Sequence, residues 1–365
     1  MNVLVVDTGS ASLHLRVLGP DDEVLAQADV GGADGPQTDR AWRDLAAGDL
    51  PISAVGHRLV HGGPRLSQPT VIDDKVRAEL EGVAKLAPLH VPQALAALDE
   101  ARTALPDVPH VACFDTAFHA DLPEAARMYA LPAEWRERYG LRRYGFHGLS
   151  YAWALGHAAE LIGRPVDEIQ VVLTHLGGGC SACAVREGRS VDTTMGFTPL
   201  EGLVMCRRSG SVDPGLLLWL QTEHGLDADE ITQTLNRRSG LAGLSDISDD
   251  TRDLVRARVS GDAAAALALD VFTHYARRGI AAMAASLDRL DALVFTGEIG
   301  EDQPEVREEI CAGLGVLGLS AGLIPGNPSG PAIVSGPDAD VPVLVVPTGE
   351  VPQIAAEVRA TLARL

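Results

Sequence analysis

Two arginines and three carboxylates occupy positions where a folded chain could use them to hold anions. Arg58 follows an apolar run, and Arg208 lies in a segment that contains Gly and Ser. A guanidinium group binds carboxylate or phosphate oxygens through parallel hydrogen bonds and does not lose its proton. Asp7, Asp115 and Glu350 come at or shortly after the ends of apolar runs typical of buried strands. We therefore expect these carboxylates at the carboxyl-terminal edge of a sheet.

Each half of the chain contains a buried strand, a tight turn and an antiparallel return strand. The first hairpin joins residues 3–6 to residues 13–17, and the second joins residues 171–175 to residues 181–185. Three consecutive glycines, 177–179, form the second turn. Such turns present backbone N–H groups in a concave array that can hold phosphate. The repeated hairpin suggests a duplicated domain that faces itself across a cleft.

Further strands must position the charged groups. Apolar runs predict strands over residues 52–55, 111–114, 292–296 and 343–346. Arg58 would then lie just after the first of these strands, and Asp115 directly after the second.

Helices are predicted after the last two strands. Asp302 and Glu305 match a capping box with Pro304 in the first turn, and a final helix is expected from about Pro352. Strands that alternate with helices indicate an α/β protein. A chain of 365 residues exceeds what one hydrophobic core usually supports, so two domains are expected.

The composition excludes several classes of partner. The net charge of −20 disfavours nucleic acid and anionic membrane surfaces. No apolar run reaches the roughly 20 residues that span a bilayer. The chain begins directly with a strand and has no basic leader, so a cytoplasmic location is expected. A polyanionic ligand must then be held by local positive charge.

Five cysteines, an odd number, include the pair Cys180-x-x-Cys183. A second pair at zinc spacing does not accompany it. The pair lies in a predicted strand, where side chains three residues apart point to opposite faces. We interpret these cysteines as small core residues in a reducing compartment.

Four sequence blocks together resemble the acetate kinase family. The longest is Asp192-Thr193-Thr194-Met195-Gly196-Phe197-Thr198-Pro199-Leu200-Glu201-Gly202-Leu203, followed by Arg207-Arg208-Ser209-Gly210. The others are residues 56–63, residues 87–90 with 114–119, and residues 143–148, in the family's order and approximate spacing.

The resemblance implies two duplicated ribonuclease-H-like domains of the actin-like ATPase superfamily, which face each other across a cleft. It places residues 1–118 and 351–365 in an N-terminal acyl-side domain that includes the C-terminal helix. Residues 119–350 would form the donor, or nucleotide-binding, domain. Family members also imply a homodimer.

The implied reaction is reversible, direct in-line transfer of a phosphoryl group from ATP to acetate, or propionate, with Mg²⁺. The resemblance gives catalytic roles to Arg58, His90, Asp115, His147 and Arg208. It places Val60, Leu89, Phe146 and Pro199 in an apolar acyl pocket, and Mg²⁺ beside Asp7, Asp115 and Glu350. The donor is expected at Ser10, Ser12, His14, His175, Gly177, Gly178, Gly179, Gly297, Glu298 and Gly300.

Several donor-side positions depart from the family pattern, while the acyl side matches it. His14 replaces a lysine, although Arg16 follows on the same strand face. Gly178 replaces an asparagine whose amide binds phosphate, and Ser211 replaces an aspartate. Glu298 replaces a glycine that lets the backbone approach the nucleotide.

These departures leave three alternatives beside ATP-dependent transfer. Pyrophosphate could be the donor, since Glu298 would occupy space and repel a polyphosphate. Water could replace the donor, which would make the protein an acyl-phosphate phosphatase. A non-catalytic sensor of acyl phosphate would bind without turnover, but it has less need of the carboxylates Asp115 and Glu350.

Overall fold

The computed structural model describes residues 1–9, 12–31, 42, 50–87 and 90–365. Ser10 and Leu89, two predicted site residues, lie outside the described residues. The chain divides into two compact units. Unit 1 comprises Met1–Ala120, Phe146–Trp153 and Gly349–Leu365, and unit 2 comprises Asp121–Gly145 and Ala154–Thr348. The domain limits at residues 118 and 350 stay a prediction.

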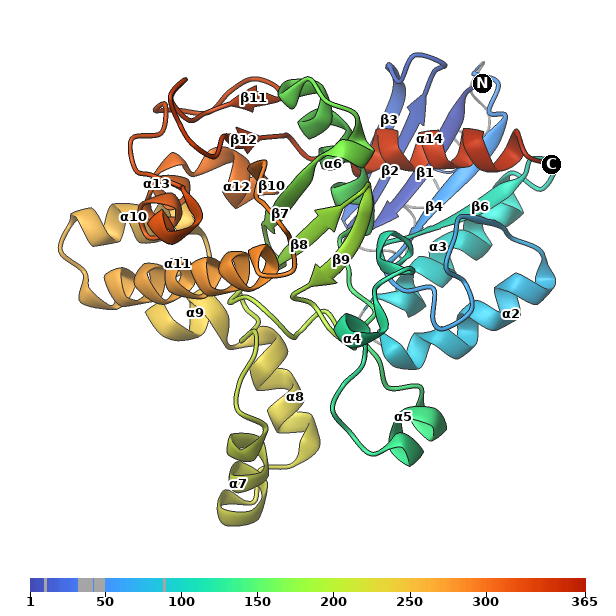
Figure 1. Ribbon diagram of the computed structural model, residues 1–365. Coiled ribbons are helices and arrows are strands. Elements are labelled where there is room, and N and C mark those ends of the chain that lie inside the picture. The colour runs from blue at the N-terminus through green and yellow to red at the C-terminus, as the bar shows by residue number, and fades with distance from the viewer. Residues whose placement is uncertain (10–11, 32–41, 43–49, 88–89) are drawn as a thin grey trace. The chain divides into compact units, whose positions relative to one another are not determined.

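Unit 1 contains a six-stranded sheet in the order β3-β2-β1-β4-β6-β5 (Figure 1). Strands β1, β4 and β6 are parallel, whereas β2, β3 and β5 are antiparallel to their neighbours. The strands are β1 (Val3–Thr8), β2 (Ser12–Leu18), β3 (Val24–Gly31), β4 (Ala54–Leu59), β5 (Thr70–Val71) and β6 (His110–Phe114).

Helices cover both faces of this sheet, which explains why β1 is apolar at every one of its first four positions. On one face, Leu4 and Val6 pack with Ala97 and Ala101 of α3. On the other face, α14 contributes Ile354, Ala355 and Val358 to the core. The helices of unit 1 with bounds in the described residues are α2 (Asp74–Val83), η1 (Ala84–Leu86), α3 (Val91–Ala104), η2 (Ala117–His119) and α14 (Glu350–Leu362).

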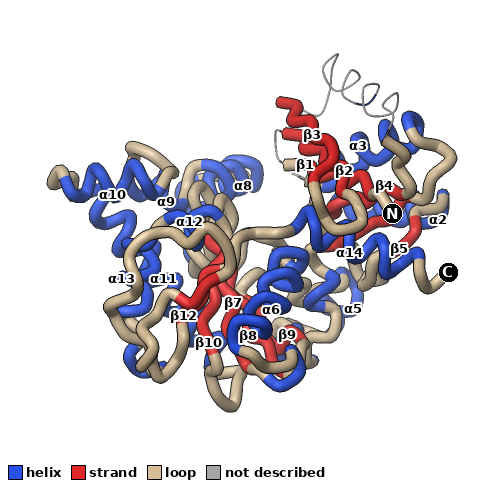
Figure 2. The backbone as a smooth tube through the Cα atoms, turned by 90° about the horizontal axis from the view of Figure 1, so that it is seen from above, coloured by secondary structure: helices blue, strands red, loops and turns tan. Residues whose placement is uncertain are grey.

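Unit 2 repeats the arrangement with the order β11-β12-β10-β7-β8-β9. Strands β7, β10 and β12 are parallel, and β8 and β9 continue the sheet antiparallel beyond β7 (Figure 2). The strands are β7 (Gln170–Leu176), β8 (Cys180–Arg186), β9 (Arg189–Thr193), β10 (Ala292–Thr296), β11 (Ala332–Ile333) and β12 (Val343–Val345). Read from opposite ends, the two sheets share one topology, so the predicted duplication and fold class are confirmed.

The longest helix, α11 (Ala263–Ala284), packs against β7 and β8. Its buried residues include Ala265, Leu269, Phe272 and Ala276, which recur at helical spacing. The shorter helices before it are α4 (Glu124–Arg127), α5 (Ala133–Tyr139), η3 (Val166–Glu168), α7 (Pro214–His224), α8 (Ala228–Arg237), α9 (Gly240–Ser245) and α10 (Thr251–Val259). The others are α12 (Glu298–Asp302), α13 (Pro304–Ala312) and η4 (Gly315–Leu317), while α6 (Gly148–Ile162) begins in unit 1 and ends in unit 2.

Two local predictions were wrong, and the last helix is present but starts two residues before its expected position. The strand predicted at 52–55 is β4, Ala54–Leu59, so Arg58 lies within the strand. The apolar criterion missed this because β4 contains polar side chains that pack in the folded protein. Asp302 ends α12 instead of capping α13, whose N-cap is Gln303 without a side-chain capping bond. The last helix starts at Glu350, not near Pro352.

The remaining sequence expectations on cysteines and membrane segments can be compared with the described residues. Cys180 and Cys183 are both buried in β8 and carry free thiols, as the core interpretation predicted. Within the described ranges, helices are too short or too polar to cross a bilayer.

A buried pair of histidines links β4 to β6. His57 Nε2 lies 2.9 Å from His110 Nδ1, and His110 Nε2 lies 3.0 Å from the carbonyl oxygen of Leu105. A carbonyl only accepts, so His110 Nε2–H donates to Leu105 and His57 Nε2–H donates to His110 Nδ1. This pattern of donors holds for two neutral rings, the form that burial favours. Burial lowers the pKa of His57 well below its ordinary value, and the pKa of His110 is lowered for the same reason.

This pair predicts a loss of stability in acid. The folded-state pKa values are lowered, so below about pH 6.5 the unfolded chain binds protons that the folded chain does not. Each such histidine removes about 1.4 kcal/mol of unfolding free energy per pH unit until its folded-state pKa is reached. We expect His57→Gln, which keeps an amide donor for His110, to flatten this slope. Urea unfolding between pH 7 and 5 measures how the unfolding free energy changes with pH. The same change per pH unit in the wild type and in His57→Gln would contradict the prediction.

Candidate functional site

The carboxyl-terminal ends of three parallel strands bring one arginine between two carboxylates. Asp7 lies near the end of β1, Arg58 near the end of β4, and Asp115 directly after β6. Arg58 Nη1 donates to Asp7 Oδ1 and Oδ2 at 3.3 and 3.4 Å. Arg58 Nη2 donates to Asp115 Oδ2 at 3.1 Å. The structure therefore brings these three predicted site residues together within unit 1.

Glu350 interacts electrostatically with Arg58 and Asp115 of the same cluster. Burial alone would lower the pKa of Arg58, but Asp115, Asp7 and Glu350 together raise that pKa well above its ordinary value. The pKa of Asp115 rises to about 6, chiefly because burial disfavours its charged form, with Glu350 and Asp7 adding to the increase. Arg58 opposes this increase. Three carboxylates against one guanidinium leave net negative charge that a cation would offset.

Two buried atoms of the cluster lack hydrogen-bond partners among the described residues. These are Nε of Arg58 and Oδ1 of Asp115. Such groups are costly to leave unpaired unless a ligand or water satisfies them. The described residues contain no group of three or more His, Cys, Asp or Glu side chains arranged as a metal cage. Mg²⁺ needs only one or two carboxylates besides phosphate and water, so the free oxygen of Asp115 fits this ion.

His147 joins the cluster through the backbone. It directly precedes α6 and has a positive φ of 60°, a strained conformation for a residue with a β-carbon. The next residue, Gly148, donates its N–H to the carbonyl oxygen of Asp115 at 2.9 Å. A β-carbon on Gly148 would lie 2.3 Å from that oxygen, so only glycine permits this approach. The strain at His147 and its link to Asp115 support a functional position.

The acyl-side predictions fall in both units. Val60 is partly buried just after β4, and Phe146 is buried with its carbonyl oxygen 3.0 Å from His119 Nε2. Pro199 belongs to unit 2. His90 is the N-cap residue of α3, without a side-chain capping bond. The structure thus assigns Val60, Phe146 and His90 to the unit that contains Arg58.

The first hairpin has its own charge network. The Nδ1 atom of His14 lies 2.7 Å from Asp29 Oδ1, and Arg16 Nη2 lies at the same distance from that oxygen. Ser12 Oγ lies 2.9 Å from His14 Nε2. His14 and Arg16 do share one strand face, as predicted. Both contact Asp29, however, so the positive charge of Arg16 is already paired within the hairpin.

The turn between β7 and β8 holds the glycines predicted to bind phosphate. Gly177 N–H donates to the carbonyl oxygen of Gly179 at 3.1 Å, so this amide is used within the turn itself. Gly178 has open space where a side chain would stand. A β-carbon on Gly177 would lie 3.4 Å from His175 Nε2 and 3.8 Å from the backbone nitrogen of Glu298. His175, the glycine turn and α12 are therefore neighbours in unit 2.

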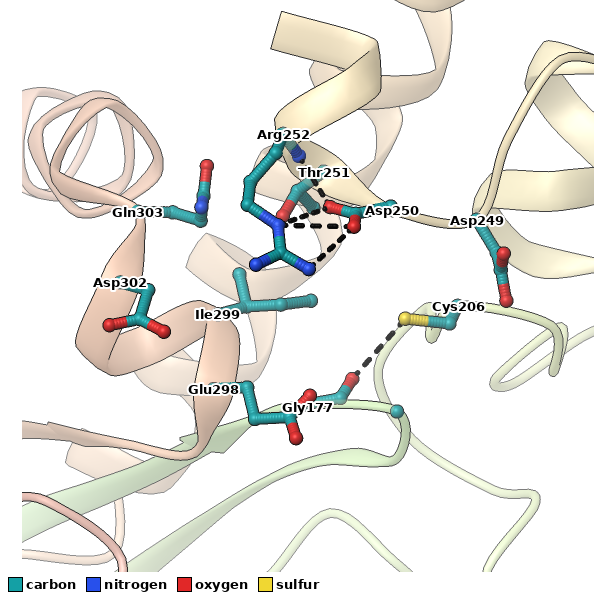
Figure 3. A pocket seen from close by; sticks show the side chains of 11 residues that line it. Gly177, Cys206, Asp249, Asp250, Thr251, Arg252, Glu298, Ile299, Asp302 and Gln303 are labelled. Atoms are coloured by element: carbon teal, nitrogen blue, oxygen red, sulfur yellow. Dashed lines mark hydrogen bonds and ion pairs between the residues drawn. The ribbon is translucent and has the colours of Figure 1, made fainter.

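A cavity of about 420 Å³ opens beside this turn (Figure 3). Gly177 and Gly178 line it together with Glu298 and Ile299 of α12. Gly297, which precedes α12, has φ 83°, and a β-carbon there would collide with the backbone of Leu176. Gly300 is buried in α12. Of the predicted donor residues, Gly177, Gly178 and exposed Glu298 line this pocket of unit 2, and Gly297 and Gly300 are next to its wall in sequence.

The rest of the pocket was not predicted from the sequence. Asp249, Asp250, Arg252, Asp302 and Gln303 complete the wall, together with Cys206 and Thr251. Arg252 is held by Asp250, with Nη2 2.7 Å from Oδ2. These side chains come from the start of α10 and the end of α12, and no motif links the two segments. The helix pattern alone offered no signal for them.

Arg307 fixes the helix that carries Glu298. Its guanidinium is buried and donates to the carbonyl oxygens of Gly300, Glu301 and Gly326 at 2.8, 2.6 and 2.8 Å. Glu301 Oε1 in turn accepts from the N–H groups of Gly297 and Thr348. Both ends of α12 are therefore held, although the helix has only five residues.

Arg208 is a partly buried cation without a carboxylate partner in the described part of unit 2. Its Nη1 donates to the carbonyl oxygen of Pro199 at 3.0 Å. Burial lowers its pKa from the ordinary value. A guanidinium that is desolvated but not neutralised favours binding of an anion.

A second network that the sequence did not reveal holds the signature segment. Arg143 Nη2 donates to Glu201 Oε1 at 2.8 Å, and Arg143 Nη1 donates to the carbonyl oxygen of Thr194 at 3.1 Å. Tyr129 donates to Glu201 Oε2 and accepts from Phe197 N–H at 2.8 Å. Arg143 and Glu201 both belong to the recognised blocks, which was the available signal. They position the segment that contains Pro199.

Comparisons with known proteins agree with one another. A sequence-family model, described as the Acetokinase family, matches residues 38–356 of this chain. An acetate kinase of Leifsonia xyli subsp. xyli (strain CTCB07) is 45% identical over 97% of this chain and 97% of the relative. An acetate kinase of Synechococcus sp. (strain JA-2-3B'a(2-13)) is 50% identical over 94% of this chain and 86% of the relative.

Solved structures give the same result. The crystal structure of Porphyromonas gingivalis acetate kinase matches with a TM-score of 0.90 and 34% identity, over 99% of each chain. A propionate kinase from Francisella tularensis subsp. tularensis SCHU S4 matches with a TM-score of 0.90 and 31% identity, over 98% of each chain. Both similarities extend through both units.

The Arg58 cluster predicts a measurable coupling. Arg58 opposes the raised pKa of Asp115, so Arg58→Met should raise that pKa further above about 6, by roughly one unit or more. Carbon-13 NMR titration of labelled aspartate carboxyls measures this shift. Arg65→Met is the matched control, because Arg65 is exposed and pairs with Glu79. An unchanged Asp115 titration in Arg58→Met would contradict the described ion pair.

Proposed function

Because the chain belongs to the acetokinase family, as its motifs had indicated, we propose that it catalyses reversible phosphoryl transfer from ATP to acetate. The product is acetyl phosphate, formed by direct in-line transfer. The observation that carries this assignment is the agreement of the family motifs with relatives that cover nearly the whole chain. Arg58, held between two carboxylates and with a free Nε, supports it chemically.

On the acceptor side, Arg58 and Arg208 bind and neutralise the acyl substrate and the transferring group. Arginine suits this role because charge spreads over the equatorial oxygens of the phosphoryl group. His147 hydrogen-bonds that group from its strained backbone position, and His90 assists it. Val60, Leu89, Phe146 and Pro199 provide apolar contacts for the methyl end of the substrate.

On the donor side, the pocket of unit 2 holds the nucleotide. We expect donor contacts from His175, Gly177, Gly178, Gly179, Gly297, Glu298 and Gly300, of which Gly177, Gly178 and Glu298 line the pocket. The family resemblance also implies donor contacts at Ser10, Ser12 and His14. Mg²⁺ would be held by Asp115 and Glu350 with Asp7 nearby, and it would neutralise phosphate oxygens. Asp115 also orients Arg58 through the 3.1 Å hydrogen bond.

The substrate class is a short carboxylate, with acetate first and propionate second. Both an acetate kinase and a propionate kinase match with the same TM-score, so the fold does not separate them. One methylene in an apolar pocket is worth only about 1–3 kcal/mol. The comparisons do not favour the alternatives, a pyrophosphate donor, a phosphatase or a sensor, because the named relatives are kinases.

The test is an assay with hydroxylamine, which traps acyl phosphate as a hydroxamate. The protein is incubated with Mg²⁺ and acetate, with ATP and pyrophosphate as separate donors, and in parallel with propionate. Product with ATP supports the proposal. Product with pyrophosphate alone would overturn the donor assignment. If neither donor gives product in this assay and the reverse reaction from acetyl phosphate is also not detected, the kinase assignment is overturned.

We expect the Glu298 side chain to weaken the affinity of the protein for ATP. Its carboxylate lines the donor pocket and repels the polyphosphate, so Glu298→Gly should lower the KM for ATP by about three- to tenfold. The KM for acetate should stay unchanged, since Glu298 does not belong to the acyl-side residues. Steady-state kinetics with each substrate varied in turn measures both values.

Two further variants separate charge from size. Glu298→Gln removes the charge and keeps the bulk of the side chain. If charge repulsion dominates, it should lower the KM for ATP almost as far as Glu298→Gly does. Glu305→Gln is the control, because Glu305 lies on the next helix and does not line the pocket. A higher KM for ATP in Glu298→Gly would show instead that the carboxylate assists donor binding.

We also propose that the protein acts as a homodimer in the cytoplasm. Helix α7 supports a subunit interface because it contains no buried residue, yet exposes Leu216, Leu218 and Trp219. Exposed apolar side chains gathered on one element are typical of interaction surfaces. A reducing compartment agrees with the free thiols of all five cysteines.

Trp219→Ser should therefore shift the protein toward monomer. Trp135→Ser on α5 is a closely matched control, since Trp219 is 51% exposed and Trp135 is 52% exposed. Sedimentation velocity over a concentration series measures the dissociation constant, which should rise at least tenfold only in Trp219→Ser. An equal effect of both substitutions, or a monomeric wild type, would contradict an α7 interface.

A further inference from the structure

Two thiols share one backbone acceptor in the donor turn. Cys180 Sγ–H donates to the carbonyl oxygen of Gly177 at 3.3 Å, and Cys206 Sγ–H donates to the same oxygen at 3.5 Å. The two sulfur atoms therefore lie no farther apart than the sum of these distances. No other pair of cysteines in the described residues shares an acceptor in this way. Figure 3 shows Cys206 directed at Gly177 beside the cavity.

The two cysteines differ in access and in mobility. Cys180 is the first residue of β8 and is fully buried. Cys206 is partly exposed, lines the cavity and lies outside helices and strands. A reagent in the cavity can therefore reach Cys206 first, and rotation of its side chain moves its sulfur without breaking the sheet.

We propose that Cys206 and Cys180 form a modification site, at which a low-molecular-weight disulfide oxidises the two thiols to an internal disulfide. The Cys206 thiolate attacks one sulfur of the reagent, forms a mixed disulfide and releases one thiolate. The Cys180 thiolate then attacks Cys206 Sγ and releases the second thiolate. The protein loses two electrons and two protons, and the reagent gains both as two thiols.

Burial and charged neighbours control the rate of this reaction through the pKa values of the two thiols. Burial raises the pKa of Cys206 to about 11, and Asp249, Glu298 and Asp250 add to the increase while Arg207 opposes it. Burial also raises the pKa of Cys180, and Arg208 opposes that increase. Both groups are thiols at neutral pH, so the exchange is slow there. The rate should rise about tenfold per pH unit between pH 7 and 9, as the thiolate fraction grows.

The disulfide would change the donor turn. It replaces both hydrogen bonds to Gly177 and draws the segment of Cys206 toward the start of β8. Forming a bond of about 2.05 Å between the sulfurs requires such a shift. Resting on the proposed function, this predicts weaker binding of ATP, with the residues of the Arg58 cluster untouched.

The first test maps the bond without an activity assay. The full chain is treated with oxidised glutathione at pH 8, blocked with N-ethylmaleimide, digested and examined by mass spectrometry without reduction. We expect a peptide that links Cys180 to Cys206, and its loss after dithiothreitol. Cys180→Ser should accumulate glutathione on Cys206 instead. Cys183→Ser, on the same strand, is the control that keeps the linked peptide.

Several outcomes would overturn the site. These are stable glutathione on Cys206 in the wild type, a link to another cysteine, no modification, or a rate independent of pH. The second test measures KM for ATP and acetate before and after oxidation. We expect at least a fivefold rise in KM for ATP, reversed by dithiothreitol and absent in Cys206→Ser treated alike, because neither the mixed nor the internal disulfide can form at that position. A linked peptide in a protein that fails the hydroxamate assay would refute the proposed function but not the modification site.

Discussion

The ion-pair cluster of Arg58 depends on one topological constraint, the parallel pairing of β1, β4 and β6. Parallel strands end at a common edge, so Asp7, Arg58 and Asp115 meet although they lie far apart in sequence. The cluster retains negative charge and two unpaired buried atoms. A protein tolerates such costs where a ligand completes the arrangement. Gly148, which follows His147, donates its N–H to the backbone carbonyl oxygen of Asp115 and so holds His147 beside this cluster.

Unit 2 uses the same fold, and its pocket is also acidic. Its pocket contains four carboxylates, from Asp249, Asp250, Glu298 and Asp302, whereas Arg252 is already paired with Asp250. A polyanion in this pocket would need further positive charge or N–H donors to offset these carboxylates. Arg307 keeps the wall rigid by holding the carbonyl groups of α12. Glu298 and Asp302 of the acidic wall therefore stand on a short helix that is held in place.

Sequence patterns located most elements but misjudged some of their ends. The apolar run at 52–55 marked a strand, yet β4 continues through His57 and Arg58 because tertiary neighbours bury and pair these polar groups. Asp302 matched a capping box by spacing, but clamping of α12 by Arg307 and Asn327 made it the last residue of a helix. Local spacing contains no information on such distant partners.

By itself, the sequence determined the family, the duplicated α/β fold and the residue types of the acyl side. These follow from short motifs and apolar periodicity, which act over a few neighbouring residues. Only the tertiary structure decided that Arg58 lies between Asp7 and Asp115, that Asp29 contacts both His14 and Arg16, and that two thiols meet at Gly177. Such contacts arise when strands and helices distant in sequence pack together, because burial and charge depend on position in space.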